Sequence, residues 1–469
     1  LLATPVLLAT QNWDDHDRSK RYLARDIGQN YFNSLQEEGN PIIFNNGDND
    51  TFPLWYNQEV EGVRLDSRTC NFSYLNTDWY IDQMKRTAYA GPALPITWTK
   101  EFYGGDRYNS VDINPDRKKE ILYRQKLAKE ALAKGDDTRW KQFVRDYGEE
   151  PFTVQNIFNK WLLSNDPSRQ VIPTDTLVIK VDKEAVKRSG MYIPEGYEND
   201  IPDYMYINLK NRKLLTKGNL MLLEILANAN WERPVYIAIS VGGDEYLNLD
   251  KYLVQEGLTY RFTPFNMEVI QNERMKKMYP GVDVSKIPYQ IPLDTEKMYN
   301  NLLHRFKFGG MDTDGIYIDE NAMRMCLTHR RTFVQLAAQY VEENKFEKAK
   351  EVLAYCEKVI PAKNVPHDFQ SYSHIMAESY YAMGMDDKAK EIAVTLAERS
   401  LAYIDWSMSL SNSKMITVLS TLQYNLNLLR NITATINRYD ELTAEGYAIQ
   451  LDKVSKELGK RVEMIKRGY

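Results

Sequence analysis

Apolar residues near the start of the chain follow helical spacing first and then form short uninterrupted runs. Between residues 17 and 39 they recur with the period of a helix, at Leu23, Ile27, Tyr31 and Leu35. The runs "PIIFNN" and "RTCNFSYLN" predict two short buried strands, with a helix through "LWYNQEV" between them and another beginning in "LNTDWYIDQM". Strands and helices that alternate in this way are typical of β-α-β units.

The same alternation returns after a charged stretch. Residues 105–170 are charged and helical in pattern, and we interpret them as an insertion. Strand-like runs then follow at "DTLVIKV", "YMYINL", "RPVYIAIS" and "GLTYRFTPF", with the helix "KGNLMLLEILANA" among them. Residues 12–265 are therefore predicted to form an α/β domain with an open, largely parallel, Rossmann-like sheet that helices cover on both faces.

The rest of the chain is predicted to be helical. A stretch rich in Pro, Gly and Asp at 266–325 is interpreted as a linker, and residues 326–469 as an all-α domain. Apolar and small residues in this domain recur at tetratricopeptide spacing in two copies. Ala349 and Ala389 fall where paired helices must approach closely, so we expect both to lie at helix contacts.

Length and charge indicate how many domains the chain has and which partners are unsuitable. A chain of 469 residues exceeds one ordinary core, which favours two or three domains. The net charge of -5, the pI of about 5.8 and the absence of a basic run argue against a nucleic-acid partner. The apolar opening "LLATPVLLA" is too short to span a bilayer. Residues 1–11 are interpreted as the end of a membrane helix or a linker, and a removed signal peptide is the alternative.

Two acidic segments are the candidate functional features. The first, "NWDDHDRS" at residues 12–19, follows the apolar opening, and the second, "NNGDNDTFPLWY" at residues 45–56, follows the first predicted strand. We predict that they meet at one edge of the sheet, where open α/β sheets bind ligands. The candidate substrate-binding residues are Trp13, Asp14, Asp15, His16, Asp17, Arg18, Asp48, Asn49, Asp50, Trp55, Asp78 and Trp79.

The chemistry of these segments leaves two interpretations open. Several carboxylates with one imidazole can do acid/base work or hold a divalent cation, for which the Asp48/Asp50 edge is the candidate site; no other cofactor is indicated. Asp and Asn also cap helices and form turns, so the first segment is equally suited to start a helix at Arg18 and the second to make a turn.

Longer stretches of the sequence carry a family resemblance. "NWDDHDRSKRYLARDIGQNYFNSL", "NGDNDTFPLWYNQEVEGVRLDSRTCNFSYLNTDWYIDQMK", "NWERPVYIAIS" and "EGLTYRFTPF" resemble the extramembrane C-terminal half of a bacterial membrane-protein family of unknown function. That family is classed with GT-C glycosyltransferases and labelled protein O-mannosyltransferase-like. The resemblance covers residues 1–265 and implies a missing transmembrane half that uses a lipid-linked sugar and carries the catalytic acid. No catalytic residue can therefore be carried over to this chain.

Three functions remain as hypotheses. The resemblance favours the periplasmic part of a membrane-bound glycosyltransferase, anchored at the inner membrane, which recognises an acceptor protein or glycan. In this hypothesis the missing transmembrane half and a protein docked on the helical domain are its partners, and we expect Tyr355 and Tyr381 to be exposed contacts for that docked protein. The alternatives are a stand-alone carboxylate or metal-dependent glycan hydrolase and a non-catalytic tetratricopeptide scaffold.

Overall fold

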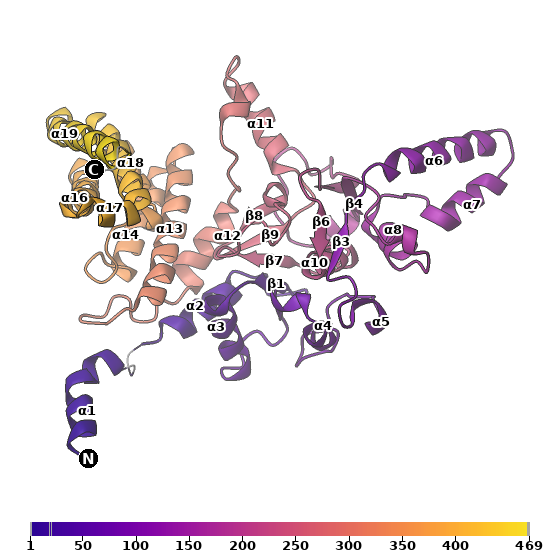
Figure 1. The fold of residues 1–469 in the computed structure, drawn as a ribbon, viewed down its shortest axis with the longest axis horizontal. Coiled ribbons are helices and arrows are strands. Elements are labelled where there is room, and N and C mark those ends of the chain that lie inside the picture. The colour runs from indigo at the N-terminus through magenta and orange to yellow at the C-terminus, as the bar shows by residue number, and fades with distance from the viewer. Residues whose placement is uncertain (1, 18, 20, 467–469) are drawn as a thin grey trace. The chain divides into compact units, whose positions relative to one another are not determined.

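The fold consists of two compact units. The computed structural model describes residues 2–17, 19 and 21–466, with the backbone alone at 14–16 and 464–466. One unit, Gly28–Asn301, holds all the strands and is called the sheet unit here; the other combines Leu1–Ile27 with Leu302–Tyr469 and is called the helical unit. Figure 1 labels the strands and helices of both units. An α/β domain followed by a helical region is therefore confirmed.

The central sheet is mixed. Its strands lie in the order β2-β1-β7-β9-β8, with the bounds Ile42–Asn45 (β1), Arg68–Asn71 (β2), Val235–Ala238 (β7), Leu253–Gln255 (β8) and Thr259–Phe262 (β9). β1 pairs in parallel with β2 and β7, as predicted, whereas β9 is antiparallel to both β7 and β8. The prediction of a largely parallel sheet is wrong for this half because a tight turn at Gly257, with a φ of 117°, folds β9 directly back beside β8.

Two runs that were predicted to join the sheet form a pair of their own. β4 (Thr176–Lys180) and β5 (Tyr204–Asn208) are antiparallel to each other, and a second small pair joins β3 (Ser110–Asp112) to β6 (Leu214–Thr216). Buried and more exposed residues alternate along β4 and β5, whereas every residue of β1, β2 and β7 is buried. One-sided burial suits an antiparallel pair, and complete burial suits the centre of a parallel sheet.

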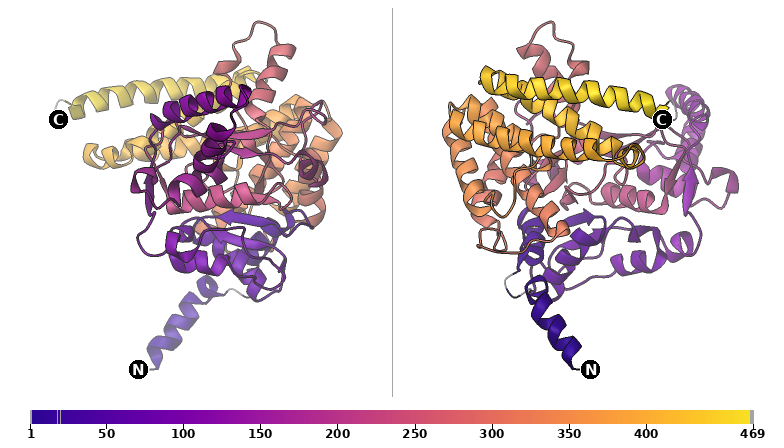
Figure 2. Two further views of the ribbon diagram at one scale, coloured as in Figure 1. Left: turned by 90° about the vertical axis from the view of Figure 1, so that its right-hand side faces the viewer. Right: turned by 60° about the vertical axis from the view of Figure 1, so that its left-hand side comes forward.

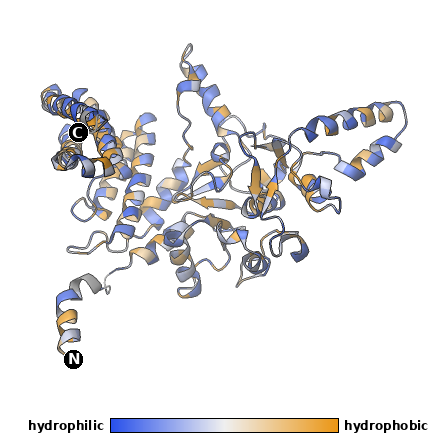
Figure 3. Cartoon of the chain, viewed as in Figure 1, coloured by the Kyte–Doolittle hydropathy of each residue, from blue (hydrophilic) through white to orange (hydrophobic). Residues whose placement is uncertain are grey.

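Helices surround these strands. Figure 3 shows the strands coloured as hydrophobic, while much of the α6–α7 hairpin is hydrophilic. This hairpin occupies the predicted insertion and projects from the unit (Figure 1). The helices from the start of this unit up to β7 are α2 (Leu23–Asn33), which begins five residues before the unit, α3 (Asp48–Glu59), α4 (Asp78–Met84), α5 (Lys100–Tyr103), α6 (Arg117–Ala133), α7 (Thr138–Tyr147), α8 (Val154–Ile157), α9 (Lys183–Arg188) and α10 (Lys217–Asn228).

The buried helix α10 and one close helix contact fix the core. Residues 217–227 of α10 are all buried, so this helix is apolar around most of its circumference. Gly28 of α2 faces α3, where an added Cβ atom would lie 2.4 Å from the carbonyl oxygen of Pro53. The lack of a side chain at Gly28 therefore allows α2 and α3 to touch.

The stretch interpreted as a linker contains secondary structure. It includes α11 (Met267–Met278), α12 (Thr295–Asn300) and the π-helical turn Asn301–Arg305, and its residues up to Asn301 belong to the sheet unit. Met267 and Ile270 of α11 are buried in a cluster with Val254 and Phe265. Apolar packing therefore ties the start of this stretch to the strands.

The C-terminal helices pack as neighbours in sequence. α13 packs on α14 and α15 on α16, while α18 packs on both α16 and α19. Figure 2 shows these helices lying side by side. Ala349 and Ala389 are fully buried, which agrees with their predicted place at helix contacts, and the tetratricopeptide assignment itself stays a prediction. The bounds are Glu320–Glu342 (α13), Phe346–Val359 (α14), Ser373–Ala382 (α15), Asp386–Ser409 (α16), Asn412–Thr417 (α17), Leu419–Asn437 (α18) and Glu441–Lys466 (α19).

The apolar opening and the first part of the first acidic segment form one helix. α1 (Ala3–His16) ends at His16, and the backbone of Asp17, the next residue, is extended. The expectation that a helix begins at Arg18 is wrong, because the next helix begins at Leu23; Arg18 itself lies outside the described residues. Among the described residues, no helix combines the length and the apolar character needed to cross a bilayer.

Candidate functional site

The second acidic segment lies at the carboxyl edge of the parallel strands. Because β1, β2 and β7 run in the same direction, their carboxyl ends share one edge of the sheet. The chain leaves β1 at this edge, turns at Gly47, whose φ is 83°, and enters α3 at Asp48. The left-handed φ of Gly47 suits glycine and permits this abrupt change from strand to helix.

Asp50 is the centre of a buried hydrogen-bond network at this edge. Its side chain is 1% exposed and accepts hydrogen bonds from the Tyr31 hydroxyl at 2.8 Å and from the Ser240 hydroxyl. Burial raises the pKa of the Asp50 carboxyl above its usual value, and the hydrogen bonds from Ser240 and Tyr31 oppose part of this rise. Asp50 therefore joins α2, α3 and the segment that follows β7, and it does more than form a turn.

A second set of polar side chains lies beneath the same edge. The Thr51 hydroxyl donates to the Asn45 side-chain oxygen at 2.7 Å, and the Asn71 amide donates to the Thr51 hydroxyl at 2.8 Å. All three residues are buried, and Asn45 and Asn71 are register partners at the ends of β1 and β2. Within the described residues, the buried side-chain nitrogen of Asn45 has no hydrogen-bond acceptor.

The other polar candidates at this edge differ in whether their side chains are free to bind a ligand. Asp48 and Asn49 are exposed, and the Asp48 carboxylate forms no hydrogen bond or ion pair with any described residue. Asp78 accepts hydrogen bonds from the backbone N–H groups of Trp79 at 2.8 Å and Gly105 at 3.4 Å. The structural role that the sequence left open thus applies to Asp78, whereas Asp48 is available to a ligand.

An aromatic row lies beside these carboxylates. We define it as Phe52, Trp55, Tyr74 and Trp79, whose successive ring centroids are 5.9, 6.2 and 5.9 Å apart. The two end members, Phe52 and Trp79, are 52% and 54% exposed. Single exposed rings are common on this chain, but four rings in contact with one another form a contiguous apolar surface. The row therefore makes this edge a candidate binding surface.

The first acidic segment contributes less to the described site. The side chains of Asp14, Asp15 and His16, and the whole of Arg18, lie outside the described residues. Trp13 and Asp17 are exposed, and the Asp17 carboxylate accepts a hydrogen bond from the backbone of Ser19 at 2.9 Å. This segment belongs to the helical unit, so its predicted meeting with the second acidic segment stays a prediction.

The geometry offers no metal centre within the described part of the chain. No group of three or more His, Cys, Asp or Glu side chains there is arranged to hold a metal ion. The divalent cation considered at the Asp48/Asp50 edge therefore has no supporting ligand set among these residues.

Sequence reasoning missed Tyr31 and Ser240. Tyr31 was assigned to the apolar face of a helix, although its hydroxyl reaches Asp50. The predicted strand run "RPVYIAIS" includes Ser240 as its last residue, whereas β7 ends at Ala238 and leaves Ser240 just beyond the strand, where ligand-edge side chains occur. That position was the signal that could have found Ser240.

One of the two tyrosines expected as partner contacts is buried. Tyr381 is 5% exposed and its ring stacks on that of Tyr439, with centroids 4.2 Å apart, so the expectation of exposure is wrong. Tyr355 is half-buried, with its ring 6.1 Å from those of Phe308 and Phe333. Both rings complete aromatic packing that the repeat pattern alone does not reveal.

Comparison with known proteins places the sheet unit in a family. A family model described as TMEM260-associated domain 2 matches residues 24–279, more than half of the chain. The chain belongs to this family. TMEM260-associated domain 2 therefore runs from α2 to the end of α11 and includes the central sheet, the second acidic segment and the aromatic row. No curated protein and no solved structure matches the chain.

Proposed function

We propose that this chain is the periplasmic part of a membrane-bound glycosyltransferase of the protein O-mannosyltransferase-like type. In this proposal the sheet unit recognises the acceptor protein or its glycan. The membership in TMEM260-associated domain 2 is compatible with such a glycosyltransferase-associated part. The observation that carries the proposal is the exposed aromatic row beside an unpaired carboxylate at the carboxyl edge of the sheet.

The chemistry of the edge suits a sugar or a glycosylated peptide. Aromatic faces pack against the apolar C–H faces of sugar rings, and Tyr and Trp combine an apolar body with a polar group. The exposed carboxylate of Asp48 can accept hydrogen bonds from ligand hydroxyls, and the Asn49 amide can both donate and accept. Phe52 and Trp79 supply the exposed rings on either side.

Recognition is favoured over hydrolysis at this edge. A glycan hydrolase needs two carboxyl groups that can reach the scissile bond. Asp50 is buried and both of its carboxylate oxygens accept hydrogen bonds from within the fold, from Tyr31 and Ser240. Asp48 then remains as the available carboxylate at the end of β1, which suits binding better than acid/base work.

The membrane part of the proposal concerns residues outside this chain. A transmembrane half would bind the lipid-linked donor and carry the catalytic acid, with the chain described here anchored at the periplasmic face of the inner membrane. Leu2, Val6, Leu7 and Leu8 of the N-terminal region are exposed, and such an apolar surface is usually covered by a membrane or another protein. The helical unit would dock a protein partner, and tetratricopeptide-like repeats would suit that role.

A glycan and glycopeptide array tests the recognition role. The labelled 469-residue chain is expected to bind a subset of the array, and the double variant Trp55→Ala, Trp79→Ala should bind that subset about tenfold more weakly or less. Trp406→Ala is the matched control for Trp79→Ala, because Trp406 is 50% exposed and Trp79 is 54% exposed, and Trp406 lies in the helical unit. The single variant Trp79→Ala is included because Trp79 is exposed, so its replacement should leave the fold intact. Equal binding by wild type and both edge variants, or no binding by wild type, contradicts the proposal.

A further inference from the structure

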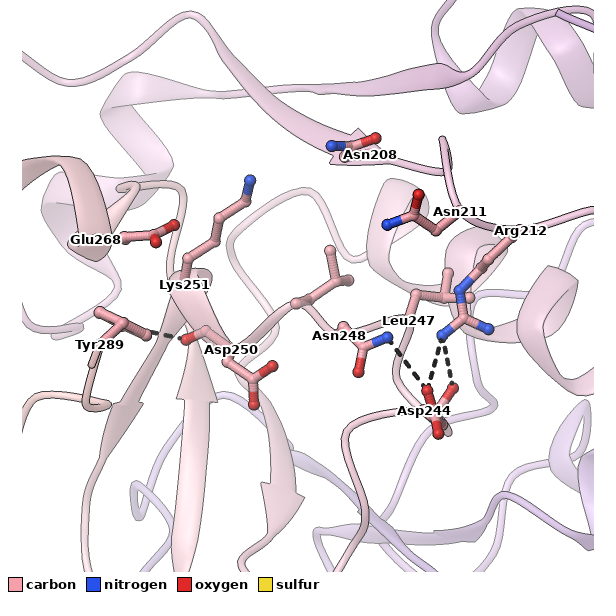
Figure 4. A pocket seen from close by; sticks show the side chains of 11 residues that line it. Asn208, Asn211, Arg212, Asp244, Leu247, Asn248, Asp250, Lys251, Glu268 and Tyr289 are labelled. Atoms are coloured by element: carbon pink, nitrogen blue, oxygen red, sulfur yellow. Dashed lines mark hydrogen bonds and ion pairs between the residues drawn. The ribbon is translucent and has the colours of Figure 1, made fainter. Parts of the chain in front are cut away.

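A polar pocket of about 520 Å³ opens in the sheet unit apart from the aromatic row. It lies between the turn that joins β5 to β6, the loop of residues 239–249 that follows β7, and the first turn of α11 (Figure 4). The lining residues that carry the inference are Asn208, Asn211, Arg212, Asn248, Lys251 and Glu268. This volume lies within the range of small-molecule sites in proteins.

One side of the pocket is held in place by internal contacts. Arg212 forms an ion pair with Asp244 at 3.5 Å, and the Asn248 amide donates to the same carboxylate at 3.2 Å. The Tyr289 hydroxyl donates to the backbone oxygen of Asp250 at 3.3 Å. Figure 4 draws these contacts as dashed lines, together with the hydrogen bond that Arg212 donates to the backbone oxygen of Asp244 at 3.3 Å. The wall is thus arranged before any ligand arrives.

Other polar groups of the pocket are available to a ligand. Among the described residues, none forms a hydrogen bond or ion pair with the side chains of Asn211, Lys251 or Glu268. In Figure 4 the amides of Asn208 and Asn211 and the ammonium group of Lys251 border the open space. The Asn211 amide supplies both donors and an acceptor, and the Asn208 amide supplies donors, since its oxygen accepts from the backbone N–H of Lys210 at 3.0 Å. Lys251 supplies donors and Glu268 supplies acceptors.

The loop at the pocket is strained. Leu247 and Asn248 both have left-handed backbone conformations, with φ angles of 62° and 52°. Asn adopts this conformation readily, but a Leu there is unusual and persists only where the surroundings enforce it. Leu247 is buried, so packing holds it in this state. Enforced strain of this kind clusters at ligand sites, and here it fixes the neighbouring Asn248 at the wall.

The distribution of charge selects the class of ligand. Asp244 already neutralises Arg212, and Lys251 is outnumbered by the carboxylates of Asp250 and Glu268. A phosphate group would therefore lack a surplus of positive charge, and an apolar ligand would leave the amides without partners. A hydroxyl group, which both donates and accepts, fits the mixed lining. We propose that this pocket binds a neutral saccharide of one or two sugar residues.

This inference does not depend on the transferase role. The pocket and the aromatic row share no residue, so substitutions can be made in one without changing a residue of the other. Either proposal can consequently fail while the other holds.

Saturation-transfer NMR and calorimetry on the 469-residue chain test the pocket. The probes are disaccharides of gluco, galacto and manno configuration at millimolar concentration, with inorganic phosphate and glucuronate as charged comparators. At least one neutral disaccharide is expected to bind saturably, and Asn211→Ala and Lys251→Ala should each weaken it about tenfold through a lost hydrogen bond. Asn199→Ala and Lys276→Ala are matched controls, because both residues are exposed and lie outside the pocket.

The outcomes separate this site from the aromatic row. Loss of binding in Asn211→Ala and Lys251→Ala, with retention in both controls and in the Trp55→Ala, Trp79→Ala variant, supports a saccharide pocket. Loss only in the tryptophan variant assigns the sugar to the aromatic row and overturns the pocket proposal. Preference for phosphate or glucuronate, or no saturable binding of any disaccharide, also overturns it.

Discussion

The hydroxyl of Tyr31 lies 2.8 Å from a carboxylate oxygen of Asp50 and joins α2 to the first turn of α3. The Ser240 hydroxyl reaches the other carboxylate oxygen, so two helices and the segment after β7 meet at one buried acid. Because the Asp50 carboxyl joins these elements, the packing of the sheet edge depends on whether this carboxyl is protonated.

Replacement of Asp50 should make stability less dependent on pH. Burial raises the folded pKa of Asp50 above the unfolded value of 3.8, so the folded state binds the proton more tightly. The contribution of Asp50 to the free energy of unfolding is present below pH 3.8 and decreases as pH rises through the folded pKa. Asp50→Asn cannot ionise, so the stability of the variant relative to wild type should increase over this window.

Urea unfolding at a series of pH values measures this difference. Asp48→Asn is the matched control, since Asp48 is exposed at the same helix end. A relative stability of Asp50→Asn that stays constant from acid to neutral pH would show that the Asp50 carboxyl is not perturbed.

Gly28→Ala should destabilise the sheet unit by about 1 to 3 kcal/mol through overpacking. The added Cβ atom would lie 2.4 Å from the Pro53 carbonyl oxygen and 2.4 Å from the Asn57 side-chain nitrogen, so α2 and α3 must separate. Gly242→Ala is the control, because no atom lies within 4 Å of a Cβ atom there. The two free energies of unfolding are compared in urea, and equal values would argue against the close helix contact.

Acid should weaken the helical unit through His329. This side chain is fully buried, and burial lowers its pKa to about 4, so the folded state keeps it neutral. Because the unfolded chain binds the proton near pH 6.5, the stability contribution is complete above pH 6.5 and is lost as pH falls towards 4. Thermal unfolding of His329→Gln should depend less on pH in this window than that of wild type.

His367 provides an internal comparison for this effect. Burial also lowers the pKa of His367 to about 4, so one substitution should remove only part of the pH dependence. The double variant His329→Gln, His367→Gln should remove more of it than either single change. Identical pH profiles for wild type and the double variant would refute the role of both histidines.

Ala349→Phe should destabilise the helical unit by about 1 to 3 kcal/mol. Ala349 is fully buried in α14, a helix that packs against α13, so a phenyl ring in its place must displace neighbouring atoms. Ala354→Phe tests the same helix at an exposed position and should change the melting temperature little. Similar melting temperatures for both variants would mean that the predicted close packing at Ala349 is absent.

The pattern of apolar and polar residues predicted where strands and helices lie better than it predicted which strands pair and in which direction. The strands at "PIIFNN" and "RPVYIAIS" and the helix after Asp48 were predictable, since burial, period and turn residues lie within a few positions. The reversal of β9 depends on which strand lies beside it, and an apolar run reads the same in either direction. Pairing partner and direction are tertiary properties, which explains the error.

At the candidate site, too, local sequence identified individual residues but not the contacts between residues far apart in the chain. Asp50 and the tryptophans were predictable as unusual residues next to a strand, whereas the contact of Ser240 with Asp50 joins residues 190 positions apart. No local spacing encodes such a contact. Tyr381 was misassigned for a similar reason, because the ring that covers it comes from Tyr439, after α18.

The loop of residues 239–249 contacts the carboxyl edge of the sheet and also lines the polar pocket. At its start Ser240 donates to Asp50, in its middle Glu245 accepts a hydrogen bond from Asn46 at 3.2 Å, and near its end Leu247 and Asn248 line the polar pocket. A movement of this loop would therefore change both the hydrogen bonds at the sheet edge and the wall of the pocket. If both proposed sites bind their ligands, any change that the pocket ligand makes in the affinity of the sheet edge must be matched by an equal change in the opposite direction of influence, from the edge ligand to the pocket.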